Sequence, residues 1–360
     1  MSNSSNPTSK LNQIFNIAHP IFQAPMAGMI STPELVAAAA NTGIMGTIAA
    51  GYLTYAQLEA EIKEVRALTE HNFCVNLFVS TSVNYAEDEL IAASDHIDLV
   101  CQNLGITQNQ TYPIRDDLPD FEEKIQLLID ENIHAVSFTF GIPNQVILDK
   151  LKHAKIKIIG TATHLLEAIL WEDKGADALV LQGLEAGGHR ATFIGDPLQV
   201  MQPLNALIYQ IKKEIPLLPI IAAGGLMNAK DIIAATIIGA DAVMLGTAFL
   251  CSSESGASYA YKLRLLEANE LDLILTKAWS GKWARGLKNK ATIELETASS
   301  EVIAPFPIQN NLTQCIRQHG LKANNADHLP LWAGTGFTRC ESLSATELIN
   351  NLLSELELFK

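Results

Sequence analysis

Apolar and polar positions alternate in blocks along the first 250 residues. Short runs that are apolar throughout occupy residues 20–26, 44–50, 73–78, 135–141, 157–162, 178–183, 219–225 and 242–250. Amphipathic stretches lie between them, at 33–41, 55–69, 121–131, 144–154, 164–174, 197–214 and 228–238. The first kind is typical of strands buried on both faces of a parallel sheet, and the second of surface helices. Eight strands that alternate with helices predict an α/β fold of the (β/α)8 TIM-barrel type.

The joints between these blocks repeat. The sequence Gly-Ala-Asp-Ala stands at 175–178 and again at 239–242, each time before an apolar strand. Glycine at this place ends a helix in the left-handed conformation. Helix starts are marked as well, by Thr32 before Pro33 and by Asn228. The same helix-to-strand joint built twice supports the barrel.

Two segments fall outside the alternation. Residues 80–120 form a long connection after the third strand, with a helical pattern at 86–104 and a turn-rich piece at 111–119. Residues 254–360 carry helical patterns at 257–269, 309–320 and 344–358 around a Gly/Trp-rich middle at 279–286. We therefore predict a polar N-terminal arm (1–19), a barrel (20–253) with an insertion (80–120), and a mostly helical C-terminal extension (254–360) that contributes to the substrate pocket.

Composition narrows the classes of function. Hydrophobic residues make up 48% of the 360 residues, enough for a sizeable core, and the net charge is −14. An acidic chain without a Lys/Arg cluster is a poor candidate for binding nucleic acid or an anionic membrane. No apolar run reaches the roughly 18 residues of a membrane helix, and the polar first ten residues do not form a secretory signal. Five cysteines without a CxxC pair indicate reduced thiols and a cytoplasmic location.

Glycines follow the last two predicted strands, as Gly224-Gly225 and Gly246-Thr247. The loops at these places commonly bind phosphate in barrels of this type, because glycine lets backbone N–H groups approach phosphate oxygens. The alternative for Gly224-Gly225 taken alone is a simple tight turn. The sequence has no Walker lysine, and no GxGxxG motif follows a strand, so neither a P-loop nor a Rossmann site is supported.

His189 follows Gly187 and Gly188 after the sixth predicted strand, at the edge where barrel active sites lie. We predict that it is catalytic or contacts substrate, although a lone histidine is often structural. With an ordinary pKa near 6.5 it would accept a proton or donate to an anionic substrate. The histidines show no HxH or HExxH spacing, so no metal site is expected.

Asn76 and Gln182 are amides at the ends of otherwise apolar strands. Buried amides need hydrogen-bond partners. One interpretation is that they bond backbone or each other. The other is that they bond the polar edge of a flat heterocycle, which presents both donors and acceptors.

Several motifs taken together resemble the nitronate monooxygenase family, formerly called 2-nitropropane dioxygenase, in its class I form. They are Gln-Ala-Pro-Met-Ala-Gly at 23–28, Val-Asn-Leu-Phe at 75–78, Val-Ser-Phe-Thr-Phe-Gly-Ile-Pro at 136–143, Gln-Gly-Leu-Glu-Ala-Gly-Gly-His-Arg at 182–190, Ala-Ala-Gly-Gly at 222–225 and Leu-Gly-Thr-Ala-Phe-Leu at 245–250. The similarity continues at 284–286 and 331–334, so it spans nearly the whole chain in order.

The resemblance implies an FMN-dependent enzyme that oxidises alkyl nitronates, such as propionate 3-nitronate, with molecular oxygen to a carbonyl compound and nitrite. His189 matches the family's active-site histidine. In this interpretation 25–27 lie against the isoalloxazine and 244–247 lie at the phosphate. The implied cofactor-binding residues are Ala24, Pro25, Met26, Ala27, Asn76, Gln182, Gly187, Gly188, Gly224, Gly225, Met244, Leu245, Gly246 and Thr247.

Two other functions use the same features. One is an FMN-dependent NAD(P)H:acceptor reductase, of the enoyl-acyl-carrier-protein or quinone reductase type. Rapid bleaching of the flavin by NADH would favour it. The other is a non-redox role, as a phosphosugar isomerase or a ligand-binding barrel, and a yellow protein would leave little room for it. The expected partners are a small-molecule substrate and O2, with the oligomeric state left open.

Overall fold

The computed structural model describes residues 10–79, 85–107, 120–299 and 301–359, so the turn-rich piece at 111–119 lies outside the described residues. Eight parallel strands form one sheet in the order β1-β9-β8-β6-β5-β4-β3-β2. They are β1 (Ile21–Gln23), β2 (Gly46–Ala49), β3 (Phe73–Phe78), β4 (Ala135–Thr139), β5 (Lys157–Ala162), β6 (Ala178–Gln182), β8 (Ile220–Ala223) and β9 (Ala242–Leu245). A parallel bridge between Phe22 and Met45 joins β1 to the chain entering β2 and completes the ring. The predicted barrel is confirmed.

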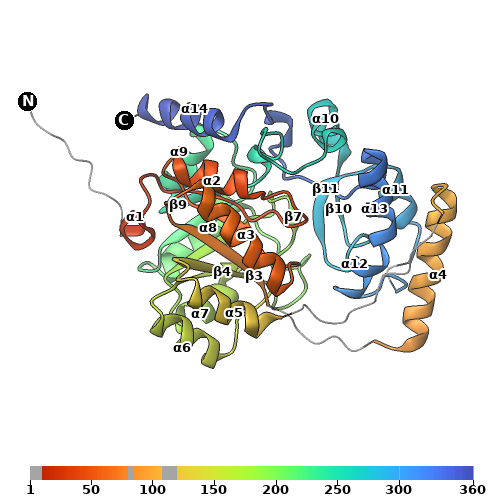
Figure 1. Ribbon diagram of the computed structural model, residues 1–360, viewed down its shortest axis with the longest axis horizontal. Coiled ribbons are helices and arrows are strands. Elements are labelled where there is room, and N and C mark those ends of the chain that lie inside the picture. The colour runs from red at the N-terminus through yellow and green to blue at the C-terminus, as the bar shows by residue number, and fades with distance from the viewer. Residues whose placement is uncertain (1–9, 80–84, 108–119, 300, 360) are drawn as a thin grey trace, which may run out of the picture.

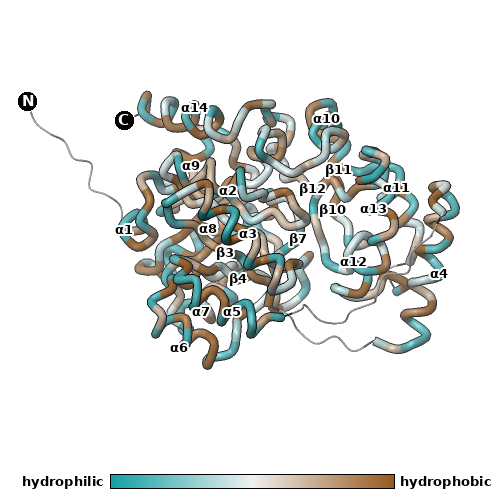
Figure 2. The backbone as a smooth tube through the Cα atoms, viewed as in Figure 1, coloured by the Kyte–Doolittle hydropathy of each residue, from teal (hydrophilic) through white to brown (hydrophobic). Residues whose placement is uncertain are grey.

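Seven helices between the strands cover the barrel from outside (Figure 1). They are α2 (Pro33–Asn41), α3 (Tyr55–Leu68), α5 (Phe121–Asp130), α6 (Gln145–His153), α7 (Leu165–Asp173), α8 (Leu204–Glu214) and α9 (Ala229–Ile238). Hydrophobic and hydrophilic positions alternate along them (Figure 2). Thr32 and Asn228 cap their helices as predicted, and Gly175 and Gly239 have the expected positive φ. The apolar sides of these seven helices pack on the outside of the sheet.

The eighth outer helix comes from the far end of the chain. Helix α14 (Ala345–Glu357) packs between α2 and α9, where a helix after β9 would stand in a regular barrel (Figure 1). Its buried residues Ala345, Leu348, Ile349 and Leu352 join the core between sheet and helices. The C-terminus therefore completes the barrel, and the extension is a long excursion between β9 and α14.

Three of the predicted elements that differ from the structure have a clear physical reason. The strand expected at 242–250 ends at Leu245, because Gly246 turns the chain into a short 3-10 helix, Thr247–Phe249. The helix expected from residue 197 begins at Leu204, since the segment before it forms a turn at Asp196 and Pro203 precedes the first helical turn. The helix expected at 309–320 is two, α12 (Ile308–Leu312) and α13 (Gln314–Ala323).

The N-terminal part contributes to the barrel core. Helix α1 (Lys10–Phe15) buries Leu11 and Phe15 against side chains inside the barrel, and the Phe15 and Phe22 rings meet edge to face at 5.6 Å. The sequence pattern indicated only a polar arm here, because one helical turn is too short to show a period. Phe15 closes the end of the barrel opposite the carboxyl ends of the strands.

The remaining elements form a second lobe beside the barrel (Figure 1), which we call the cap: α4 (Glu87–Asn103) and the described part of residues 259–332. Besides α12 and α13 it contains α10 (Tyr259–Glu267), α11 (Lys290–Leu295), β10 (Leu273–Thr276), β11 (Ala284–Leu287) and β12 (Leu331–Trp332), with short 3-10 turns at Glu270–Asp272 and Ala326–His328. Helices predominate, as expected, but the antiparallel sheet β10-β11-β12 had no recognisable sequence pattern. Helix α4, from the insertion after β3, packs on α11 and α12.

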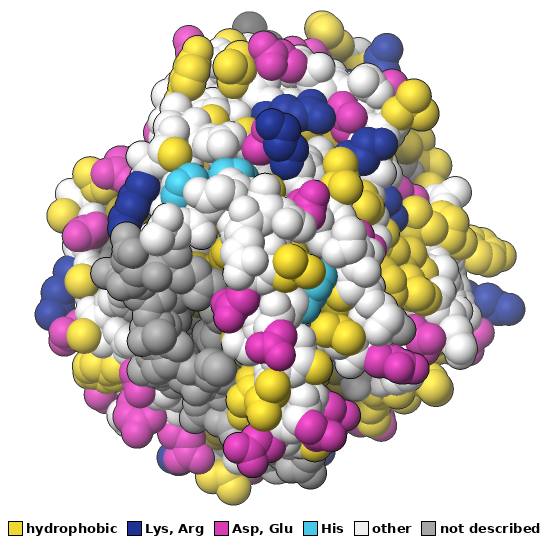
Figure 3. Space-filling model, turned by 90° about the vertical axis from the view of Figure 1, so that its right-hand side faces the viewer, with side chains coloured by type: hydrophobic (Ala, Val, Ile, Leu, Met, Phe, Trp, Pro, Cys, Tyr) yellow, Lys and Arg dark blue, Asp and Glu magenta, His cyan; other side chains and the backbone are white. Residues whose placement is uncertain are grey.

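The surface, the lengths of the helices and the thiols complete the description of the fold. Acidic, basic and apolar side chains are interspersed on the cap side of the molecule (Figure 3). Among the described residues, no helix combines the length and the apolar character needed to cross a bilayer. All five cysteines are free thiols.

A glycine-rimmed pocket as candidate active site

A cavity of about 750 Å³ opens at the carboxyl ends of the barrel strands and extends to the cap. Strand geometry explains its floor. Side chains alternate between the two faces of a strand, so residues two apart on β6, such as Val180 and Gln182, both face inward. The inward positions nearest the cap line the cavity, and they are Ala24, Asn76, Phe78, Ser137, Thr139, Thr161, Val180, Gln182, Ala223, Met244 and Gly246. Its size lies within the roughly 300–1,000 Å³ typical of cofactor and ligand sites.

The residues predicted from the sequence converge on this cavity, with one exception. His189 and the lining residues Ala24, Pro25, Met26, Ala27, Asn76, Gln182, Gly187, Gly188, Gly224, Gly225, Met244, Gly246 and Thr247 all border it. Leu245 does not. Its side chain is on the outward face of β9 and packs in the core between sheet and helices, because it alternates with the inward-facing Met244.

The glycines of the rim stand where a side chain would not fit. A Cβ on Gly187 would lie 2.4 Å from the backbone N of Gly334, and one on Gly334 would lie 2.6 Å from the carbonyl oxygen of Glu185. Gly225 has φ +68°, and its Cβ would be 2.9 Å from Thr335 Oγ1. The loop after β6 therefore meets the 333–334 segment backbone to backbone, and the loop after β8 meets the Thr335 side chain.

The two amides differ in their partners. Asn76 donates through Nδ2 to Ser137 Oγ (2.9 Å) and Thr139 Oγ1 (3.1 Å) on the neighbouring strand. Gln182 donates through Nε2 to the carbonyl of His189 (2.9 Å), and its Oε1 accepts from Ala191 N–H (2.9 Å). The side chain of Gln182 therefore bonds backbone groups, as the first of the two interpretations predicted. These bonds fix the loop on either side of Arg190.

His189 is held between barrel and cap. Its backbone lies in the two-residue strand β7 (Gly188–His189), which pairs with β11. Its Nε2 lies 2.8 Å from Ser280 Oγ, and the ring packs against Trp332 with centroids 5.4 Å apart. Burial, and after it the positive charges of Lys282 and Arg317, lowers the pKa of His189 to about 3. The pKa near 6.5 assumed from the sequence therefore does not apply, and the imidazole is neutral at neutral pH.

This shift predicts how stability depends on pH. An unfolded histidine binds a proton below pH 6.5, whereas the folded one does not until about pH 3. The contribution of His189 to the free energy of unfolding is therefore fully present above pH 6.5 and is lost as the pH falls below it. Between pH 7 and pH 5 we expect wild type to lose about 1–2 kcal/mol more unfolding free energy than a His189→Gln variant. Urea unfolding at both pH values measures this difference, and equal losses in the two proteins would contradict it.

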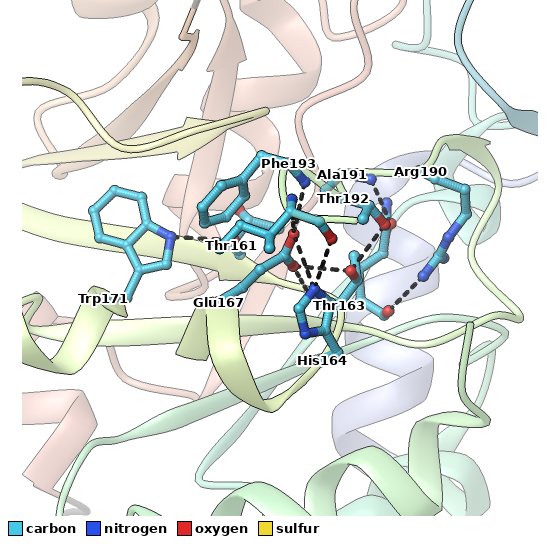
Figure 4. A network of polar contacts seen from close by, with 11 residues as sticks. Thr161, Thr163, His164, Glu167, Trp171, Arg190, Ala191, Thr192 and Phe193 are labelled. Atoms are coloured by element: carbon cyan, nitrogen blue, oxygen red, sulfur yellow. Dashed lines mark hydrogen bonds and ion pairs between the residues drawn. The ribbon is translucent and has the colours of Figure 1, made fainter. Parts of the chain in front are cut away.

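A buried carboxylate anchors the segment that follows His189 (Figure 4). Glu167 on α7 accepts hydrogen bonds from Thr163 N–H (2.7 Å) and its hydroxyl (2.8 Å), and from the backbone N–H of Phe193 (2.6 Å) and Ile194 (3.1 Å). The Thr163 hydroxyl also meets that of Thr192 at 2.9 Å. Glu167 is fully buried, so these bonds replace its hydration and fix the course of residues 192–194.

Arg190 fixes the same loop from the other side. Its side chain is 2% exposed, and Nη1 and Nη2 donate to the carbonyls of Gly183 (2.6 Å) and Gln182 (3.0 Å). Burial and the neighbouring Arg285 lower the pKa of Arg190 to about 10, so the guanidinium keeps its charge at neutral pH. Together Gln182, Glu167 and Arg190 hold the loop that presents His189.

Several lining residues had not been singled out from the sequence. Ser137, Thr139 and Thr161 are inward strand positions, and counting alternate residues along the predicted strands would have found them. Tyr52 follows β2 at the same edge. Arg317 and Trp332 line the cavity from the cap, and Ser280, also in the cap, reaches the site through its hydrogen bond with His189. Their positions depend on how the cap docks, for which the sequence carries no local signal.

The comparisons with known proteins agree with this geometry. The family model for nitronate monooxygenase matches residues 8–355. A probable nitronate monooxygenase of Bacillus subtilis is 40% identical over 343 residues, covering 95% of this chain and 97% of the relative. Another, of Staphylococcus saprophyticus, is 37% identical, covering 97% of each chain.

Two solved structures are similar in fold. One is nitroalkane oxidase from Streptomyces ansochromogenes, with a TM-score of 0.88 and 33% identity, covering 97% of this chain and 98% of that one. The other is FabK from Thermotoga maritima, with a TM-score of 0.76, covering 98% and 96%. At 24% identity, the second likeness concerns the fold alone. By the family match and the identity to its relatives over nearly its whole length, this chain belongs to the nitronate monooxygenase family.

Proposed function

We propose that this oxidoreductase binds FMN and uses molecular oxygen to oxidise alkyl nitronates, such as propionate 3-nitronate, to a carbonyl compound and nitrite. The observation that carries the proposal is the cavity itself. Glycines and a neutral imidazole line it at the carboxyl ends of the barrel strands, in a chain that belongs to this family. Five free thiols fit a reducing compartment, and we propose a cytoplasmic location.

The residues present fit FMN. Gly225 and the Gly246–Thr247 turn border the cavity after β8 and β9, where a phosphate would meet backbone N–H groups. Residues 24–27 offer a mostly apolar wall for a flat ring. Asn76 has its Nδ2 engaged with Ser137 and Thr139, so it would offer its Oδ1 to an N–H on the ring edge. Bound there, the flavin would supply the redox chemistry.

The chain's own groups suit an anionic substrate. A nitronate is already deprotonated, so the reaction needs no strong base, and a neutral His189 is not one. Its Nε2 bond to Ser280 fixes the ring plane and leaves Nδ1 for the substrate. The Ser280 hydroxyl proton has two acceptors within reach, Nε2 at 2.8 Å and the Lys282 carbonyl at 3.2 Å. When Ser280 donates to Nε2, Nδ1 carries the imidazole proton and can bond a nitro oxygen. Positive charge comes from Arg317 in the lining and Lys282 close by, both of which act on His189.

Oxygen uptake by purified, FMN-loaded protein tests the proposal. We expect uptake with propionate 3-nitronate, accompanied by nitrite release. A reductase would instead bleach on anaerobic mixing with NADH and show no nitronate-dependent uptake. Protein that binds FMN but consumes no oxygen with nitronates would contradict the proposed reaction.

The glycine rim makes a further prediction. Gly225→Leu should weaken FMN binding by at least about 10-fold, because φ is +68° and the new side chain meets Thr335 and Glu185. Gly105→Leu is the matched control. Its φ is also +68°, but its Cβ would meet nothing within 4 Å and it lies outside the cavity lining. Fluorescence titration with FMN compares the two, and equal losses of affinity would refute a specific role for the rim.

A further inference from the structure

One hydroxyl in the cavity wall has no protein partner. Tyr52 lines the cavity, and its Oη is buried without a hydrogen-bond partner among the described residues. Buried polar atoms are almost always satisfied, and leaving one unsatisfied costs about 1–3 kcal/mol. An orphaned hydroxyl that borders a ligand cavity therefore indicates a polar atom of the ligand beside it.

The position of Tyr52 is fixed. The carbonyl of the next residue, Leu53, accepts a hydrogen bond from the buried Lys124 at 2.9 Å. The Tyr52 ring meets Phe78 edge to face at 5.2 Å and Phe306 at 6.3 Å. The hydroxyl is thus held by packing around the ring and by an anchored backbone.

Arg317 supplies a positive charge in the same part of the cavity. It lies on α13, which with α12 contributes Asn310, Asn311, Gln314 and Gln318 to the lining. Its guanidinium is oriented by bonds to Thr313 Oγ1 (2.6 Å) and to the carbonyl of Asn310 (2.5 Å). The described residues that line the cavity include no Asp or Glu. A phenol donor, a guanidinium and side-chain amides together favour an oxyanion.

Burial raises the pKa of Tyr52 to about 12, while the charge of Arg317 opposes that shift. Tyr52 therefore stays protonated at neutral pH and acts as a donor. Tyr52 and Arg317 line the same cavity, which lets both face one ligand.

This position is distinct from that of His189. Phe306 contacts both rings, with its centroid 6.1 Å from His189 and 6.3 Å from Tyr52. His189 is bonded to Ser280, whereas Tyr52 and Arg317 come from the β2 loop and α13. The cavity therefore offers two polar positions beside one aromatic ring.

On the basis of the proposed function, we propose that Tyr52 and Arg317 form a specificity position that binds a carboxylate carried by the nitronate substrate. The neutral His189 faces the nitro group, and the pair holds the acid at the other end of the molecule. The enzyme then prefers nitronates with an acidic tail over alkyl nitronates of the same length.

The test compares propionate 3-nitronate with propyl-1-nitronate, which has the same three carbons and no carboxylate. Wild-type holoenzyme should prefer the first in kcat/KM. Arg317→Gln should lower kcat/KM for the acidic substrate by about 10- to 100-fold, and Tyr52→Phe by about 3- to 10-fold. Both variants should change the value for propyl-1-nitronate by less than about 3-fold. Arg317→Lys should retain part of the preference.

Leu321→Ala is the control, since Leu321 lines the cavity from the same helix but carries neither charge nor a hydrogen-bonding group in its side chain. It should affect the two substrates alike. Loosening of the α12–α13 joint in Arg317→Gln would also affect both alike, so the ratio of the two kcat/KM values separates recognition from structure. Equal effects on both substrates, loss of FMN in Tyr52→Phe, or a wild type without preference would overturn the proposal.

Binding gives a readout that does not depend on turnover. Under anaerobic conditions, 3-nitropropionate and 1-nitropropane can each be titrated into holoenzyme while the flavin spectrum is followed. We expect tighter binding of the acid, and loss of that difference in Arg317→Gln. If wild type oxidises no nitronate but still prefers the acid, the proposed reaction fails while the carboxylate position stands. If turnover occurs without any preference, only the carboxylate position fails.

Discussion

His189→Ala is expected to retain FMN and to lose about 100- to 1,000-fold in kcat/KM with nitronate, the size of loss typical when a hydrogen-bond donor to the reacting group is removed. The ring sits at the cavity wall, bonded to Ser280 and packed on Trp332, so its removal leaves the glycine rim intact. Stopped-flow oxygen consumption and the flavin absorbance of the purified variant measure the two effects separately.

Ser280→Ala is the companion variant. It removes the bond that orients the imidazole but keeps the imidazole itself. We expect a smaller loss in kcat/KM, of about 3- to 10-fold, which corresponds to the net contribution of one hydrogen bond. A His189→Ala enzyme with normal turnover would show that the residue has no role in the reaction.

Glu167→Ala is expected to lower the free energy of unfolding by about 3–5 kcal/mol, because it removes one partner from a buried charged network. Three backbone N–H groups and the Thr163 hydroxyl would lose their acceptor. Since the carboxylate fixes the loop that presents His189, turnover should fall as well. Urea unfolding and oxygen uptake measure the two losses.

Two variants serve as references. Glu167→Gln keeps the shape of the side chain and one acceptor oxygen, so about 1–3 kcal/mol should be lost. Glu172→Ala lies on the same helix at an exposed position and should change stability by less than about 0.5 kcal/mol. A loss in Glu167→Ala no larger than in Glu172→Ala would contradict the anchoring role.

The barrel could be predicted because its signals are local. An apolar run, a capping residue such as Thr32 and a glycine such as Gly239 each act within a few residues. The rim residues followed once the strand ends were placed, since a parallel barrel brings all carboxyl ends to one edge. Leu245 shows the limit: its side chain points outward beside the inward-facing Met244, which counting alternate residues along the strand would have predicted.

The parts that could not be predicted depend on contacts between distant segments. Helix α14 completes the barrel about 100 residues after β9, and nothing in its own pattern specifies α2 and α9 as neighbours. Arg317 reaches the cavity, and Ser280 reaches His189, only through docking of the cap. The pKa of His189 likewise depends on Lys282 and Arg317, which lie far from it in sequence.

One experiment tests the central claim, that this cavity holds a flavin which takes electrons from a nitronate. Purified protein is loaded with FMN, freed of oxygen and mixed with propionate 3-nitronate while the spectrum is recorded between 350 and 550 nm, roughly the range of flavin absorbance. The account predicts a yellow protein whose flavin bleaches with the nitronate and regains its colour when air is admitted. A protein that stays colourless with added FMN, or a bound flavin that the nitronate leaves unchanged, would contradict it.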